Sequence, residues 1–142
     1  MNFAIFFCRQ IDPEQDVNRR SLEKELGSRI RFFPLPCSGR IEALHLMRAL
    51  EAGADKVYLV TCPVNACRYQ EGNVRAGKRL ELARKLIEEI GLEPERIELV
   101  RSSWSGPTSI DGIARELIKR AEKLTPSPLN AEEPKEGARV TP

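Results

Sequence analysis

Four short apolar runs alternate with longer amphipathic segments along the chain. The runs are rich in β-branched and aromatic side chains and are bounded by turn residues, which predicts strands. In the segments between and after them, apolar residues recur every three or four positions, which predicts helices. The predicted strands are Asn2–Cys8, Arg29–Phe33, Val57–Val60 and Arg96–Val100, and the predicted helices run from Asp12 to Gly27, from Ser38 to Gly53, from Val74 to Ile90 and from Ile110 to Ala121.

Capping and breaking residues set the predicted boundaries. Asp12 is the predicted N-cap of the first helix, because Pro13 follows it at the first helical position, and Ser38 is the predicted N-cap of the second. Gly27 is the predicted end of the first helix. Pro34 is predicted to stop the second strand, since proline cannot donate to a ladder. The predicted buried faces of the four helices are Val17, Leu22 and Leu26; Ile41, Leu44, Met47 and Leu50; Ala76, Leu80, Ala83, Ile87 and Ile90; and Ile110, Ile113, Ala114, Leu117, Ile118 and Ala121.

This alternation predicts an α/β fold with a parallel sheet, right-handed crossovers and helices on both faces. We predict a flavodoxin-like three-layer fold whose four-stranded parallel sheet has the order 2-1-3-4. The 142 residues are enough for one domain, predicted over residues 1–123. Residues 124–142 are rich in proline and charge and have no apolar period, so we predict a disordered C-terminal tail.

Composition excludes several classes of function. The net charge of +2 is small, and no basic run is interleaved with aromatic residues, so we expect no nucleic-acid partner. No apolar segment has the length of a membrane span, and the first residues lack the pattern of a signal peptide. We therefore expect a cytoplasmic protein. Thiols stay reduced there, so the four cysteines suggest a metal site or redox chemistry before structural disulfides.

Each of the four cysteines lies at the carboxyl end of a predicted strand or in the loop beside one. Cys8 ends the first strand, Cys37 follows the second, and Cys62 and Cys67 follow the third. The carboxyl ends of parallel strands meet at one edge of the sheet, where open α/β sheets bind ligands. Any one of these residues alone would be interpreted as a small buried apolar side chain. Together they predict a four-thiolate site.

The spacing of the cysteines leaves the type of centre open. Structural zinc usually uses two tight C-x2-4-C pairs, whereas here one pair is C-x4-C and two ligands are isolated. C-x4-C also occurs in plant-type [2Fe–2S] ligation, so the spacing favours an iron–sulfur cluster without excluding a zinc-stabilised interaction module. Cys62 and Cys67 could instead form a thiol–disulfide redox pair.

Residues near the cysteines could support such a site. Cys37 directly precedes a predicted helix N-terminus, where free N–H groups and the helix dipole favour a thiolate. Arg40 and Arg68 either donate hydrogen bonds to the ligands or are ordinary solvated charges. His45 falls within a predicted helix and is not expected to be a ligand, and Trp104 is expected to pack in the last loop. No nucleotide-binding or nucleophile motif is present.

Four blocks of sequence resemble the delta subunit of methyl-viologen-reducing hydrogenase over roughly residues 3–122. The blocks are Cys37-Ser38-Gly39-Arg40, Gly53-Ala54-Asp55, Cys62-x4-Cys67 with Tyr69-x-Glu71-Gly72-Asn73, and GLEPER from Gly91 to Arg96.

The resemblance implies a [2Fe–2S] cluster, with Cys8, Cys37, Cys62 and Cys67 as its ligands. It also implies an electron carrier between a hydrogenase or formate dehydrogenase and a flavin- and cluster-bearing subunit of the heterodisulfide reductase type. The chain departs from the family at one point. The family commonly has a C-x-x-C pair after its first strand, and Ile11 occupies the second position here. All four remaining cysteines must then act as ligands in an all-cysteine cluster.

Overall fold

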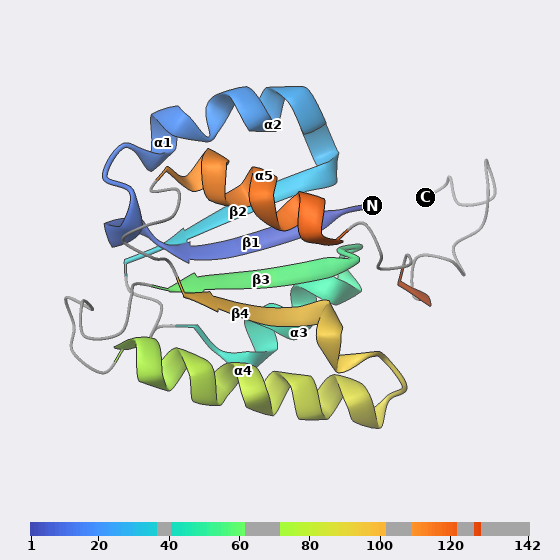
Figure 1. Ribbon diagram of the computed structural model, residues 1–142. Helices are drawn as coiled ribbons and strands as arrows, with labels where there is room; N and C mark the ends of the chain where they lie inside the picture. Colours follow the sequence, from blue (N-terminus) through green and yellow to red (C-terminus); the bar gives the residue numbers. More distant parts are fainter. Residues whose placement is uncertain (37–40, 62–71, 102–108, 122–126, 129–142) are drawn as a thin grey trace, which may run out of the picture.

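A four-stranded parallel sheet forms the centre of the protein. The computed structural model describes residues 1–36, 41–61, 72–101, 109–121 and 127–128 (Figure 1). The strands are β1 (Phe3–Cys8), β2 (Ile30–Leu35), β3 (Lys56–Thr61) and β4 (Ile97–Arg101). Their order is β2-β1-β3-β4 and every pairing is parallel, so the predicted 2-1-3-4 topology is confirmed.

Helices cover both faces of this sheet, which confirms the three predicted layers. Helices α1, α2 and α5 lie on one face, and α3 and α4 lie on the other (Figure 1). The α-helices are α1 (Gln15–Asn18), α2 (Arg20–Leu26), α3 (Ala43–Glu51), α4 (Gly72–Glu89) and α5 (Ile110–Arg120), and the short 3-10 turns are η1 (Arg9–Ile11), η2 (Gly27–Arg29) and η4 (Pro94–Arg96).

The central strands are buried on both sides, which explains why their sequences are continuously apolar. Along β1, Ile5 and Phe7 pack on the side of α2 and α5, and Ala4 and Phe6 pack on the side of α3 and α4. All six residues of β1 and of β3 are buried. Because alternate residues of a strand point to opposite faces, each strand serves two cores.

The strand register aligns the carboxyl ends at one edge of the sheet. Cys8 is aligned with Leu35 of β2, and Phe7 is aligned with Val60 of β3, so the next residues end β1 and β3 side by side. Thr61 is in turn aligned with Arg101 of β4. We call this side of the sheet, where the four strands end, the carboxyl edge, and the opposite side the amino edge.

The prediction of the first helix is wrong in where the helix starts and in its continuity. The observed helical segment begins at Gln15 and consists of two helices, α1 and α2, on either side of Arg19. Asp12 is not its N-cap, because the helix starts later and Glu14 occupies the N-cap position. The Asp12 carboxylate instead accepts the N–H of Glu14 and the distant N–H of Ile110. Val17 is 57% exposed and does not belong to the buried face. The predicted end at Gly27 is confirmed, with a φ of 59° that favours glycine.

The second predicted helix starts too early. Helix α3 begins at Ala43 with Glu42 as its N-cap, and a capping box joins Glu42 to His45, whose Nδ1 accepts the Glu42 backbone N–H at 3.1 Å. Cys37, which lies outside the described residues, is therefore not the residue directly before α3. Leu44 is 53% exposed, so it is not part of the buried face. Leu50 is buried as predicted, and Leu46, which was not predicted, is buried as well.

Two further boundary predictions are corrected. Pro34 does not stop the second strand but lies within β2, aligned with Phe7. The strand is at the edge of the sheet, where a residue without an N–H is tolerated. Ile90 lies one residue beyond the end of α4 and is 67% exposed, so it is not part of that helix's buried face.

At the amino edge, one buried carboxylate joins distant parts of the chain. Asp55 accepts the backbone N–H of Asn2 at 2.7 Å and that of Ser127 at 2.6 Å. Ser127 is buried as well. The predicted tail, residues 124–142, lies outside the described residues except for positions 127 and 128. No helix in the described ranges has both the length and the apolar character needed to cross a bilayer.

Candidate metal centre

The one predicted ligand within the described residues is Cys8. It is the last residue of β1 and is only 1% exposed. Two neighbouring strands flank β1: the ladder with β2 extends to Cys8 itself, and the ladder with β3 extends to Phe7, the residue before it. A side chain at the end of such a strand faces the ligand-binding edge of an α/β sheet. The structure thus confirms the expected strand-end position of Cys8.

The neighbouring strands end just before two more of the cysteines. In sequence, Cys37 follows the end of β2 by two residues, and Cys62 directly follows Thr61 at the end of β3. Neighbouring strands lie about 4.8 Å apart, so these three strand ends span roughly 10 Å. The predicted ligands Cys37, Cys62 and Cys67 and the candidates Arg40, Arg68 and Trp104 lie outside the described residues.

Within the described ranges, no group of three or more histidine, cysteine, aspartate and glutamate side chains could hold a metal ion. The four-cysteine ligand set therefore stays a prediction. The donor chemistry suits the group, because thiolates are the usual ligands of iron–sulfur clusters. His45 is exposed and belongs to the capping box of α3, as expected for a residue that is not a ligand.

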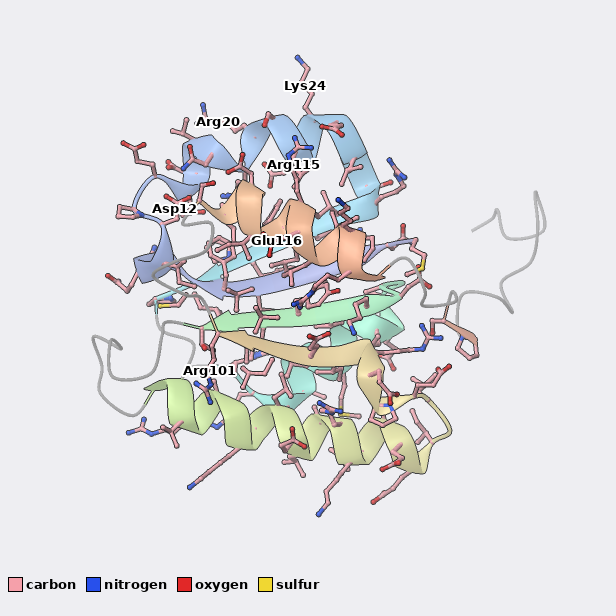
Figure 2. All side chains as sticks on the ribbon, viewed as in Figure 1. Asp12, Arg20, Lys24, Arg101, Arg115 and Glu116 are labelled. Atoms are coloured by element: carbon pink, nitrogen blue, oxygen red, sulfur yellow. The ribbon has the colours of Figure 1, made fainter. Side chains whose placement is uncertain are left out.

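The turn that follows Cys8 is fixed by a buried carboxylate. After η1, the side chain of Asp12 accepts hydrogen bonds from the Glu14 N–H at 3.0 Å, from the Asn18 amide at 2.9 Å and from the Ile110 N–H at 2.9 Å. Asp12 is 6% exposed. Figure 2 shows it at the first turn of α5, below α1. This contact ties the segment after Cys8 to the start of α5.

Two side chains accept hydrogen bonds from backbone N–H groups in the first turn of α5. The first N–H groups of a helix have no partner within the helix. Ser109 is the N-cap and accepts the Gly112 N–H at 3.4 Å, while Asp12 accepts that of Ile110. A carboxylate at this end also interacts favourably with the helix dipole. Sequence reasoning missed this role of Asp12, because it assigned the residue to the nearer helix.

Ile11 occupies the position where the family commonly has a second cysteine. The residue ends η1 and packs against the core on the side of α2 and α5. Its side chain is half-buried. The position therefore contributes apolar contact to the fold in this chain.

A cation that sequence reasoning did not single out lies at the carboxyl edge. Arg101 ends β4, is exposed, and is aligned with Thr61, the residue before Cys62. Figure 2 shows its side chain directed toward the first turns of α4. The guanidinium lies 3.9 Å from the place where a Cβ on Gly77 would be. The predicted strand order, with the last strand beside the third, could have identified this cation.

The one tyrosine within the described ranges, Tyr58, joins the sheet to a helix. Tyr58, in β3, donates a hydrogen bond from its hydroxyl to the Leu117 carbonyl at 3.0 Å and so joins the sheet to α5. Burial raises the pKa of Tyr58 to about 12, with a further increase from Glu98 that the charge of Arg120 opposes. Its location indicates a role in packing.

A buried arginine organises the amino edge. Arg96 is fully buried and donates hydrogen bonds to the Glu93 carboxylate at 2.7 Å and to the Asp55 carbonyl at 3.0 Å. The first of these lowers the pKa of Glu93, with smaller contributions from a backbone hydrogen bond and from the charge of Arg96.

A cavity of about 340 Å³ also lies at the amino edge. Its lining includes Arg31, Asn2 and Gly53 and, among the described residues, contains no cysteine. Five steps along β1, from Phe3 in the lining to Cys8, separate the cavity from Cys8, which corresponds to roughly 17 Å at the rise of a strand. The cavity is therefore not part of the candidate metal centre.

Comparison with known proteins decides the family. Residues 4–125 match the family model described as methyl-viologen-reducing hydrogenase, delta subunit. The chain belongs to this family. The predicted resemblance is therefore confirmed, and it covers nearly the whole described fold.

Several relatives are identical to the chain at about a third of the aligned positions. The vhu iron-sulfur subunit of the F420-non-reducing hydrogenase of Methanopyrus kandleri is 34% identical over 99 residues, covering 70% of this chain and 75% of the relative. The iron-sulfur subunit of the F420-non-reducing hydrogenase of Archaeoglobus profundus is 36% identical over 106 residues, covering 75% and 77%. One subunit of the ferredoxin:CoB-CoM heterodisulfide reductase of Methanosarcina mazei is 33% identical over 97 residues, which are 68% of this chain and 12% of that protein.

Proposed function

We propose that this protein is an electron-transfer subunit that carries a [2Fe–2S] cluster on Cys8, Cys37, Cys62 and Cys67. It relays electrons between a hydrogenase or formate dehydrogenase and a flavoprotein subunit of the heterodisulfide reductase type. When bound, such a cluster accepts and releases one electron at a time.

The observation that carries the proposal is the register at the carboxyl edge. Cys8 ends a central strand, and its two neighbouring strands end two residues before Cys37 and one residue before Cys62. The names of the hydrogenase relatives support the iron–sulfur character, since both are iron–sulfur subunits of F420-non-reducing hydrogenases. The match to a component of a heterodisulfide reductase supports the second partner.

The chain's own residues have defined tasks in this role. Burial of Cys8 keeps water from its sulfur, and the ladders on both sides of β1 hold it in place when the charge of the site changes. Asp12 fixes the turn that follows. With a thiolate-ligated centre bound, the exposed cation of Arg101 would favour the reduced, more negative state and so would raise the reduction potential.

The test is anaerobic preparation of the full chain, with iron and acid-labile sulfide analysis and EPR spectroscopy of the reduced protein. We expect iron and sulfide in equal amounts and the signal of a reduced [2Fe–2S] cluster. Single cysteine-to-serine variants at positions 8, 37, 62 and 67 should each lose most of the iron, because every ligand is required. A colourless protein that takes up no iron on reconstitution overturns the proposal.

The same measurements identify the two alternatives. Stoichiometric zinc without sulfide indicates a zinc-stabilised interaction module. Redox activity that survives Cys8→Ser and Cys37→Ser but not Cys62→Ser or Cys67→Ser indicates a thiol–disulfide protein.

A further inference from the structure

We propose that the first two turns of α4, together with Arg101, form a docking surface for an acidic face of the protein that exchanges electrons with this chain. The inference rests on the proposed electron-transfer function and specifies where the partner binds. We call the surface formed by Val74, Arg75, Lys78 and Arg101 the basic docking surface.

The charges of α4 are separated along its length. Residues 74–80 contain Arg75, Lys78 and Arg79 and no acidic residue, and the last turn contains Glu88 and Glu89. No acidic residue lies in the first turn of α4 and no basic residue in the last. The half of the helix nearer to the carboxyl edge is therefore cationic.

This arrangement opposes the helix dipole. Cations at a helix N-terminus and anions at its C-terminus are each unfavourable by about 0.3–1 kcal/mol at an exposed end. Helix α5 follows the favourable rule, with Asp111 in its first turn and Lys119 and Arg120 in its last. Because the charge preference of the helix dipole is followed in α5 but not in α4, the cations of α4 indicate a function other than stabilising the helix.

Two of the three cations are available to a partner. Arg79 is engaged within the fold, donating to the Ile41 carbonyl at 2.9 Å and pairing with Glu42 at 3.6 Å. Arg75 and Lys78 are exposed, and within the described ranges neither forms an ion pair.

The end of β4 extends the surface. The guanidinium of Arg101 lies against Gly77, the residue before Lys78. Arg101 is also exposed and forms no ion pair with any residue of the described ranges. Val74, one turn earlier on the helix, is 48% exposed. An apolar side chain among exposed cations suits a protein partner, because such interfaces bury apolar groups inside a charged rim.

The position suits electron transfer. Helix α4 begins five residues after Cys67, and Arg101 is aligned with the residue before Cys62. A partner that binds here lies beside the proposed cluster. Charge complementarity then selects an acidic partner and speeds its association.

The test uses a small acidic plant-type ferredoxin as the probe and the charge-reversal variant R75E/K78E of the full chain. Binding is measured by calorimetry at low and high ionic strength, which needs no cluster. We expect R75E/K78E to bind the ferredoxin about tenfold more weakly than the unchanged chain at low ionic strength, and the two to differ little at high ionic strength. The rate of electron transfer from the reduced ferredoxin should fall in parallel.

The matched control is R20E/K24E on α2, which changes the net charge by the same amount. Arg20 and Lys24 are exposed and project from the opposite face of the sheet (Figure 2). Reversal at α4 places glutamates at a helix N-terminus, which favours the helix. We therefore do not expect R75E/K78E to unfold, and circular dichroism with thermal melting checks this.

The outcomes separate the two proposals. Weaker ferredoxin binding by R75E/K78E but not by R20E/K24E supports the docking surface. This holds even if the protein assembles no cluster, a result that would overturn only the proposed function. Equal effects of the two variants on binding, or no effect of either, overturn the docking surface, and the proposed function then still stands if the protein contains a cluster. A changed midpoint potential with unchanged binding also overturns it, because the cations then act on the cluster alone.

Discussion

The carboxylate of Asp12 accepts the backbone N–H of Ile110 at 2.9 Å, although 98 positions separate the two residues. The contact joins the segment four residues after Cys8 to the first turn of the last helix. Both residues are buried. A single side chain therefore fixes one side of the carboxyl edge.

We expect Asp12→Ala to lower the free energy of unfolding by about 3 kcal/mol, because it leaves three N–H groups without their charged acceptor. Urea denaturation measures the loss. Asp16→Ala is the control, since Asp16 is an exposed aspartate in α1, and it should change stability by less than about 1 kcal/mol. Equal losses in the two variants would contradict the role assigned to Asp12.

The hydroxyl of Tyr58 makes stability depend on alkaline pH. Its pKa is raised from 10.0 to about 12, so the neutral form is favoured in the folded state. The stability that this contributes is complete below pH 10 and is lost as the pH rises through 12.

Tyr58→Phe should lower the free energy of unfolding by about 1 kcal/mol at neutral pH, because the Leu117 carbonyl loses its donor. Between pH 10 and 12 its stability should fall less steeply than that of the wild type. Denaturation across this range measures both effects. Parallel pH profiles would show that Tyr58 does not carry the dependence.

Two glycines should respond to alanine in opposite directions. Gly77 lies inside α4, and an added Cβ would meet its nearest neighbours at ordinary contact distances of 3.7 and 3.9 Å. We expect Gly77→Ala to stabilise the protein by about 0.5–1 kcal/mol. Gly91→Ala should instead lower the free energy of unfolding by about 1 kcal/mol or more, because Gly91 has a φ of 93°. Thermal melting of both variants tests this contrast.

The substitution Ile11→Cys tests whether a second cysteine after the first strand would act as a ligand or only as an additional thiol. Ile11→Cys removes apolar contact with the core, so we expect a loss of about 1 kcal/mol. Under the proposed function, the iron content and the EPR signal should not change, because four cysteines already complete the ligand set. An increase in iron per chain would indicate that the native set is incomplete.

The sheet could be predicted because its signals are strong and local. Continuous apolar runs that alternate with amphipathic segments indicate a parallel sheet, and right-handed crossovers then leave only a few strand orders, of which 2-1-3-4 is a common one. The same reasoning placed Cys8 at a strand end, where the structure has it. Helix α5 was also predictable, because its apolar positions repeat without interruption.

The errors arise where distant contacts decide the local structure. Asp12 is bound by the N–H of Ile110, which no neighbouring residue reveals. Val17 belongs to a segment with few apolar residues, so its helix had no clear apolar stripe. Leu44 belongs to a segment with apolar residues on more than one side, so the buried side of that helix was ambiguous. Burial of Arg96 depends on acceptors at Glu93 and Asp55 that only the folded chain brings to it.

Asp55 has a consequence for how this unit can be combined with others. By accepting the N–H groups of Asn2 and Ser127, it brings the start of the first strand and the segment after the last helix to the amino edge, opposite Cys8. Polypeptide joined at either place would be attached at the edge of the sheet opposite Cys8. The unit can therefore be part of a larger chain without its carboxyl edge being the point of attachment, consistent with a relative in which the matching segment makes up 12% of the protein.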